Sequence, residues 1–316
     1  MAPYGARKRS FLPNSSSHAK KRGHRAGPTQ STPCRAHRQA KTPPTIPTPA
    51  STPRRRSPTR QPPQRLRTTP HPATMPPNAT ADKFSVLLPT YNERENLPYM
   101  IYFLDAAFAS IDADYEIIIV DDASPDGTQA VARALQADFG PRKVVLAPRP
   151  SRQGLGSAYM HGIKHATGNF VLILDADMSH HPKFIPQFVK MQRETGCDIV
   201  TGTRYVSEGG VHGWTLRRKL VSRVANYLAH VMLQPGVSDL TGSFRLYRRD
   251  CFESIMQKME ARGYVFQMEI IVRARKMGYS IKEVPITFVD RLFGESKMGT
   301  SEIAQYLAQL WKLVWV

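Results

Sequence analysis

Short apolar runs that alternate with amphipathic segments constrain the fold of this chain more than any other feature. The runs FSVLL, EIIIV, KVVLA, FVLIL and DIVTGT occupy residues 84–88, 116–120, 143–147, 170–174 and 198–203. They are nearly continuous and rich in β-branched residues, which is typical of strands buried on both faces. The segments after the first two runs repeat apolar residues at helical spacing. The alternation therefore predicts an α/β fold, a mostly parallel sheet with helices on both faces.

Polar clusters follow three of these strands. They are PTYNE at 89–93, DDASPDG at 121–127 and DADMSHH at 175–181. Each cluster alone is compatible with helix capping or a turn. Because ligands of such sheets bind outside the carboxyl ends of the strands, three acidic clusters at one edge predict a binding site.

The third cluster carries two carboxylates, Asp175 and Asp177, one position apart. In an extended stretch both side chains point the same way, and like charges this close favour a cation between them. Mg²⁺ or Mn²⁺ typically takes one or two carboxylates and completes its shell with water and phosphate oxygens. Imidazoles are less suited to hard metals, so His180 and His181 are expected to form a turn instead. The pair thus predicts a metal-bound diphosphate.

The first 80 residues differ sharply in composition from the rest. They hold 16 of the 44 Lys and Arg, 16 of the 26 Pro, and no Asp or Glu. This pattern predicts a disordered basic Pro-rich tail over 1–80 and a globular domain over 81–316. A nucleic-acid arm, a membrane tether and a transit peptide remain alternatives to a dispensable extension. The three cysteines are far apart in the sequence and indicate neither a disulfide framework nor a zinc site.

The quoted clusters resemble the nucleotide-sugar domain of family 2 glycosyltransferases, whose fold is the GT-A Rossmann-like sheet. The longer blocks TGTRYVSEGGVHGW, SDLTGSFRLYRR and VPITFVDRLFGESKMG are similar to the dolichol-phosphate mannosyltransferase family, over residues 83 to 310. Within that family the chain resembles the catalytic subunit of the short eukaryotic type, which has no membrane spans of its own. The resemblance implies inverting transfer of mannose from GDP-mannose to dolichyl phosphate, for protein glycosylation and GPI-anchor assembly.

The resemblance also implies roles for individual residues. The guanosine half of the donor would be held by Pro89, Tyr91, Glu93, Val120 and Asp122. Asp175, Ala176 and Asp177 would hold the diphosphate, with Asp175 and Asp177 as ligands of Mg²⁺ or Mn²⁺. Further phosphate contacts would come from Arg204, Arg291 and Lys297, and contacts to the lipid phosphate from Arg218 and Ser222. Asp177, Arg204 and Arg218 are the expected catalytic residues. Some relatives have Gln as a metal ligand where this chain has Ser179.

A phosphate acceptor removes the need for a general base, because a phosphomonoester is largely ionised near neutral pH. Glu269 is accordingly expected to be structural or to position the acceptor. Transfer of glucose to the same lipid stays open, since no residue pattern excludes it. Polysaccharide synthesis is disfavoured because the sequence has no QxxRW motif. A nucleic-acid-binding module is the alternative of another class, disfavoured because the body outside the tail is near neutral.

Two segments indicate contact with a membrane. Residues 216–228 repeat apolar residues at helical spacing beside a basic flank, which suits a lipid phosphate at a surface. The terminal segment 301–316 has the same periodicity, with two tryptophans, and predicts an amphipathic helix. By resemblance, the chain is expected to need small membrane-embedded partner subunits and to lie on the cytosolic face of the endoplasmic reticulum. No nucleic-acid partner is expected.

Overall fold

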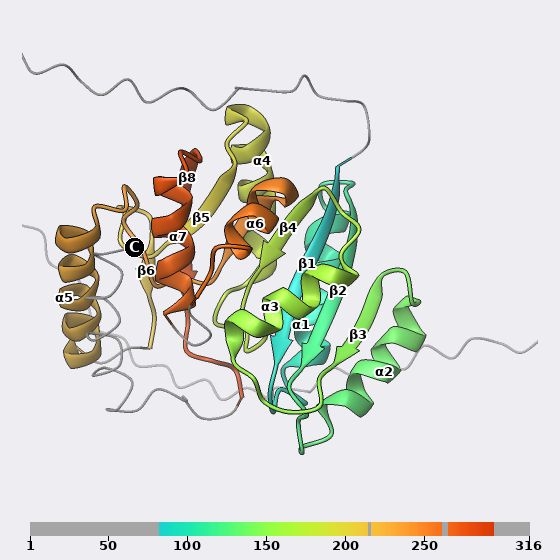
Figure 1. The fold of residues 1–316 in the computed structure, drawn as a ribbon. Coiled ribbons are helices and arrows are strands. Elements are labelled where there is room, and N and C mark those ends of the chain that lie inside the picture. Colours follow the sequence, from blue (N-terminus) through green and yellow to red (C-terminus); the bar gives the residue numbers. More distant parts are fainter. Residues whose placement is uncertain (1–81, 214–215, 261–264, 294–316) are drawn as a thin grey trace, which may run out of the picture. The chain divides into compact units, whose positions relative to one another are not determined.

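One seven-stranded sheet organises the chain. A computed structural model describes residues 82–213, 216–260 and 265–293 (Figure 1). Within these ranges, seven strands lie in the order β3-β2-β1-β4-β7-β5-β8. The strands are β1 (Lys83–Thr90), β2 (Asp114–Asp121), β3 (Val144–Pro148), β4 (Phe170–Ile173), β5 (Ile199–Thr203), β7 (Arg245–Arg248) and β8 (Ile281–Pro285). Neighbouring strands are parallel except where β7 pairs with β4 and β5. Two short strands, β6 (Gly210–Val211) and β9 (Thr287–Phe288), form a separate pair.

Helices cover both faces of the sheet (Figure 1). One face packs against α1 (Leu97–Ala109), α2 (Thr128–Phe139) and α4 (Ile185–Thr195). The other packs against α3 (Leu155–Gly162), α6 (Arg249–Met256) and α7 (Phe266–Lys276), and the inner residues of α5 (Leu216–Leu233) join the same core. The predicted α/β fold with helices on both faces is confirmed.

The continuous apolar runs are explained by this burial on two sides. Successive residues of β1 point to opposite faces, so Val86 enters one core and Leu87 the other, and both are fully buried. At the close approach of α3 to β2, a Cβ on Gly162 would lie 2.9 Å from Cγ2 of Val120. A larger residue at this position would push the helix away from the sheet.

The five strands expected from the sequence correspond to β1 through β5. Strand β7 was not expected, and it inserts antiparallel between β4 and β5. Among the described residues, Cys197 and Cys251 are buried and free. No helix among the described residues has the length and apolar character needed to cross a bilayer. The predicted tail, Lys297 and the terminal helix lie outside the described residues.

Candidate active site

The carboxyl ends of β1, β2 and β4 meet at one edge of the sheet, because β1 pairs in parallel with both neighbours. All three acidic clusters therefore begin at this edge, as predicted. Short contacts join the first two: Thr90 Oγ1 donates to Asp121 Oδ1 at 3.0 Å, and the backbone amide of Asn92 donates to Ser124 Oγ at 3.0 Å. The first two clusters are thus joined by hydrogen bonds and are not separate turns.

Asp175 is held through one of its carboxylate oxygens. Ser243 Oγ donates to Asp175 Oδ2 at 2.5 Å, and His180 Nδ1 lies 3.2 Å from the same oxygen. The imidazole is buried between the rings of Phe244 and Phe288. Partial burial by itself raises the pKa of Asp175, but the contacts with His180 and Ser243 outweigh it and the pKa lies below its usual value. The group is therefore a carboxylate at neutral pH.

Asp177 is held by its own loop and by the segment after β9. The backbone amide of Ser179 donates to Asp177 Oδ1 at 3.0 Å, and the guanidinium of Arg291 lies 3.1 Å from Oδ2. The amide of Leu292 donates to the backbone carbonyl of Asp177 at 3.2 Å. The fold thus brings Arg291 and Asp177, which are far apart in the sequence, together as an ion pair.

These two carboxylates fit a hard divalent cation shared with phosphate. The Asp175 side chain keeps 36% of its surface exposed, so one of the two carboxylates is open to an incoming group. Within the described ranges, no group of three or more His, Cys, Asp and Glu side chains is arranged to hold a metal. Two carboxylates are what Mg²⁺ typically takes from a protein, with phosphate oxygens and water completing its shell.

Residues expected at the nucleoside end form a second group at the edge. Glu93 is buried, and its Oε2 accepts from Asn96 Nδ2 at 2.7 Å. Asp122 is buried and forms an ion pair with Arg149. The guanidinium of Arg152 lies over the Tyr91 ring, 4.7 Å from its centroid. Val120 lies in the core, so its side chain faces away from this edge.

A small basic pocket lies beside α5. Its volume is about 240 Å³, and its lining includes Arg204, Lys219 and Arg223. Ser222, one of the residues expected to contact the acceptor, shares a hydrogen bond of 2.7 Å with the hydroxyl of Tyr205 in the same lining. Three cationic side chains around so small a volume suit a phosphate group.

Arg204 is tied to a carboxylate that the sequence did not reveal. Its Nε lies 2.7 Å from Asp239 Oδ2 and its Nη2 lies 2.9 Å from Oδ1, a bidentate pair. Burial alone raises the pKa of Asp239, but the charge and hydrogen bonds of Arg204 outweigh it and lower the pKa. Arg204 thus enters the pocket in a fixed orientation, set by Asp239.

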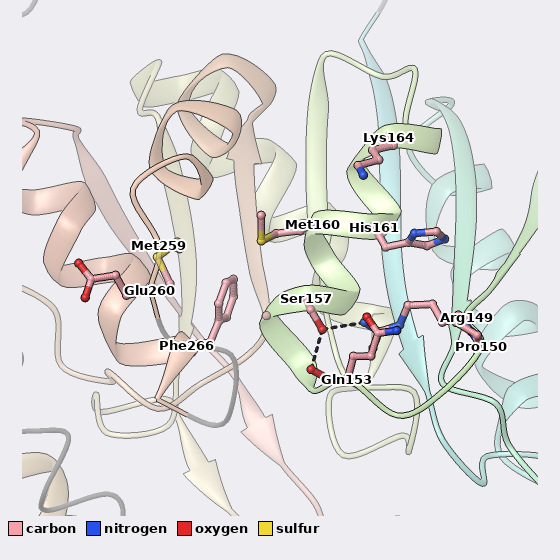
Figure 2. A pocket seen from close by; sticks show the side chains of 11 residues that line it. Arg149, Pro150, Gln153, Ser157, Met160, His161, Lys164, Met259, Glu260 and Phe266 are labelled. Atoms are coloured by element: carbon pink, nitrogen blue, oxygen red, sulfur yellow. Dashed lines mark hydrogen bonds between the residues drawn. The ribbon is translucent and has the colours of Figure 1, made fainter.

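A larger pocket of about 600 Å³ lies along α3, and Figure 2 shows its lining. Arg149 reaches it from the nucleoside group and donates to Ser157 Oγ at 2.7 Å. The remaining wall mixes apolar and charged side chains, including Met160, Lys164 and Phe266. Arg149 connects this pocket to Asp122 through its ion pair.

Several supporting residues were missed by reasoning from the sequence. Asp239 and Ser243 belong to the quoted SDLTGS block, and Asn96 follows PTYNE by three positions, so their proximity to the clusters was the available clue. Of the expected residues, Arg218 lies in α5, but its side chain is outside the described part of the chain, as is all of Lys297. The roles assigned to the expected residues stay predictions.

Comparison with known proteins identifies the family. Residues 85–256 match the model of a family described as Glycosyl transferase family 2. The chain belongs to this family. The glycosyltransferase is 39% identical over 238 residues to polyprenol monophosphomannose synthase of Mycolicibacterium smegmatis, covering 74% of this chain and 86% of that protein. It is 36% identical over 235 residues to dolichol-phosphate mannosyltransferase of Pyrococcus furiosus, covering 73% of this chain and 64% of that longer protein.

Solved structures agree with the fold of the glycosyltransferase. Glucosyl-3-phosphoglycerate synthase from Mycobacterium tuberculosis, in complex with Mn²⁺, UDP and glucosyl-3-phosphoglycerate, matches with a TM-score of 0.54 and 19% identity, over 74% of this chain and 78% of that chain. The same enzyme with Mg²⁺ and UDP gives a TM-score of 0.54 at 20% identity, over 74% and 80% of the chains. At this identity the likeness concerns the fold alone, and it confirms the predicted GT-A sheet.

Proposed function

We propose that this family 2 glycosyltransferase transfers mannose from GDP-mannose to dolichyl phosphate or a related polyprenol phosphate. The observation that carries the proposal is the 39% identity over 238 residues to a polyprenol monophosphomannose synthase. The name of the second relative, dolichol-phosphate mannosyltransferase, supports the same sugar and the same class of acceptor. The arrangement at the sheet edge supports a nucleoside diphosphate donor.

The donor diphosphate would lie against Asp175, Asp177 and Arg291. A divalent cation, Mg²⁺ or Mn²⁺, would be held by Asp175 and Asp177 and would neutralise charge on the diphosphate. Arg291 lies 3.1 Å from Asp177, so its guanidinium is positioned to contact phosphate oxygens beside the carboxylates. As the bond between the sugar and GDP breaks, negative charge grows on the leaving diphosphate, and fixed cationic groups stabilise that charge.

The acceptor phosphate would enter the basic pocket beside α5. Lys219, Arg223 and the oriented guanidinium of Arg204 supply positive charge there. A phosphomonoester with a second pKa of about 6 is largely a dianion at neutral pH, so it attacks without a general base. Direct displacement by a phosphate oxygen of the acceptor would invert the configuration at the anomeric carbon and give a β-linked mannosyl phosphate.

Glu269 is engaged elsewhere, which agrees with a structural role. Its Oε1 lies 2.5 Å from Arg273 Nε and accepts from the backbone amide of Glu260 at 3.0 Å. The carboxylate is buried. It therefore supports the start of α7, and the reaction proposed here needs no base from it.

Transfer of radiolabelled mannose from GDP-mannose to dolichyl phosphate in Mg²⁺-containing detergent tests the proposal. UDP-glucose in a parallel reaction distinguishes the glucosyl alternative. We expect an acid-labile, lipid-extractable mannose product and no comparable glucose product. Labelling with UDP-glucose alone, or no labelling from either donor, would contradict the proposal.

We also propose that α5 contacts the membrane that carries the acceptor. Six apolar side chains of this helix are between 41% and 85% exposed: Leu216, Leu220, Val224, Tyr227, Leu228 and Val231. Lys219 and Arg223 of the same helix line the phosphate pocket, so the exposed face and the pocket are adjacent. An amphipathic helix with basic residues binds anionic lipid surfaces.

In a cell the membrane that α5 contacts would be that of the endoplasmic reticulum, at its cytosolic face. Small membrane-embedded subunits would be the partners of the protein there. The product would serve protein glycosylation and GPI-anchor assembly.

Flotation with liposomes tests the contribution of α5. We expect Leu220→Glu combined with Tyr227→Glu to reduce flotation several-fold while GDP binding stays unchanged. Co-expression with the partner subunits is expected to move the protein into the membrane fraction, and full attachment without them would contradict that part of the proposal.

A further inference from the structure

We propose that Asn96 is a positioning residue that couples the nucleoside end of the donor site to its diphosphate end. The inference rests on the proposed donor site and adds to it a residue that touches neither the reacting atoms nor the phosphates. It links Glu93 at one end with the segment that carries Arg291 at the other.

The amide of Asn96 is buried and uses both of its polar atoms. Nδ2 donates to Glu93 Oε2 at 2.7 Å and to the backbone carbonyl of Phe293 at 3.2 Å. Oδ1 accepts from the backbone amide of Phe293 at 3.2 Å. One side chain therefore holds a carboxylate and clamps both backbone groups of a residue 197 positions away in the sequence.

The clamped segment leads directly to the carboxylates at the diphosphate end. Arg291 lies 3.1 Å from Asp177 Oδ2, and the amide of Leu292 donates to the carbonyl of Asp177 at 3.2 Å. The Phe293 ring also packs against Tyr99, with centroids 5.9 Å apart. A short stretch of chain thus runs from the Asn96 clamp to the Arg291 guanidinium, so release of the clamp would loosen the position of that charge.

The position of Asn96 in α1 supports this assignment independently. It stands at the N-cap of the helix, where asparagine ordinarily accepts a hydrogen bond from a backbone amide of the first turn. Asn96 makes no such side-chain cap bond. Its side-chain amide is directed instead to Glu93 and Phe293, so the side chain connects these two residues and does not cap the helix.

An amide is the group that fits both contacts. A carboxylate of the same shape accepts from the Phe293 amide but cannot donate to Glu93, and it would place two negative charges together. Alanine removes all three bonds. Aspartate therefore loses both bonds that Nδ2 donates, to Glu93 and to the Phe293 carbonyl, and keeps the bond from the Phe293 amide, whereas alanine loses all three.

The test is a double-mutant cycle on the full chain, read as the dissociation constant of GDP with Mg²⁺ by calorimetry. Arg291→Ala is expected to weaken GDP binding about tenfold or more through loss of a charged phosphate contact. Asn96→Ala is expected to weaken GDP binding several-fold. The double variant is expected to bind GDP only slightly more weakly than Arg291→Ala does, so the two effects on the dissociation constant should not multiply, and the difference from multiplication should be several-fold. In transfer assays the Michaelis constant of the donor should rise and that of the lipid acceptor should not.

Asn169→Ala is the matched control, because its Oδ1 accepts from the Lys83 amide at 2.7 Å at the opposite, amino-terminal edge of the sheet. We expect its GDP affinity to equal that of the unmodified protein. Asn96→Asp gives a second reading if the alanine variant does not fold, and it should also weaken GDP binding.

The outcomes separate the inference from the proposed function. If Arg291→Ala leaves GDP affinity unchanged, the proposed donor site is wrong. If Arg291→Ala weakens binding but the two single effects multiply in the double variant, the donor site stands and the coupling through Asn96 is wrong. If Asn96→Asp changes the Michaelis constants of donor and acceptor equally, Asn96 has only a general structural role and the inference is wrong.

Discussion

Replacing Asp239 with alanine should destabilise the protein strongly, because it leaves the Arg204 guanidinium buried without its counter-charge. The two side chains are 0% and 6% exposed. Asp239 accepts from Arg204 Nε at 2.7 Å and from Nη2 at 2.9 Å. It also accepts from the backbone amides of Thr241 at 3.2 Å and Gly242 at 3.1 Å, so the loop between α5 and β7 depends on the same carboxylate.

The size of the effect follows from this burial. Removing one partner of a buried ion pair typically costs about 3–5 kcal/mol. For a domain of about 200 residues, each kcal/mol lowers the melting temperature by about 2–4 °C, so the expected fall is roughly 6–20 °C. The activity of any folded fraction should fall as well, since the orientation of Arg204 is lost.

Scanning calorimetry and urea unfolding measure the change. Glu194→Ala is the control, because its ion pair with Lys190 is 3.8 Å long and largely exposed, and such pairs contribute about 0–1 kcal/mol. Arg204→Leu combined with Asp239→Leu removes both charges and should recover much of the lost stability while activity stays low. A melting temperature for Asp239→Ala within about 2 °C of the unmodified protein would refute the reasoning.

Four further predictions concern activity, acid stability and the tail. Asp177→Asn should fold normally and lose transfer by about thirtyfold to a thousandfold, which corresponds to ~2–4 kcal/mol, and near-normal rates with Mg²⁺ or Mn²⁺ would contradict the metal assignment. Arg218→Ala should raise the Michaelis constant of the lipid phosphate far more than that of GDP-mannose, and equal effects would exclude an acceptor role. Burial opposes ionisation of Glu116, but hydrogen bonds from Ser85 and Thr167 lower its pKa below the ordinary 4.5. The ionised side chain therefore stabilises the fold above pH 4.5, and this stabilisation is lost as the pH falls further. Glu116→Gln should flatten the decrease in the free energy of unfolding, measured in urea, towards acid pH. A protein that begins at Ala81 should keep its activity and its melting temperature within about 2 °C, and failure to fold or to transfer mannose would overturn the prediction for the tail.

Local sequence was enough to predict the acidic edge of the site but not the residues that hold it in place. Asp175 and Asp177 follow a buried strand, and a parallel sheet brings the ends of such strands together whatever the details of packing. Ser243 lies 68 positions from Asp175, and Asp239 lies 35 positions from Arg204. Each of these pairs depends on β7 entering the sheet antiparallel between β4 and β5, a strand order that local periodicity does not encode.

The sequence by itself determined the α/β architecture, the positions of the first five strands along the chain and the edge at which the acidic clusters gather, because continuous apolar runs are typical of strands buried between two layers of helices. Tertiary structure alone decided the partner of each buried polar group. A buried carboxylate, amide or guanidinium requires a partner, and packing decides which one lies within reach. Asn96 is an example, because its amide finds its partner at Phe293, 197 residues away in the sequence, and no local pattern indicates that contact.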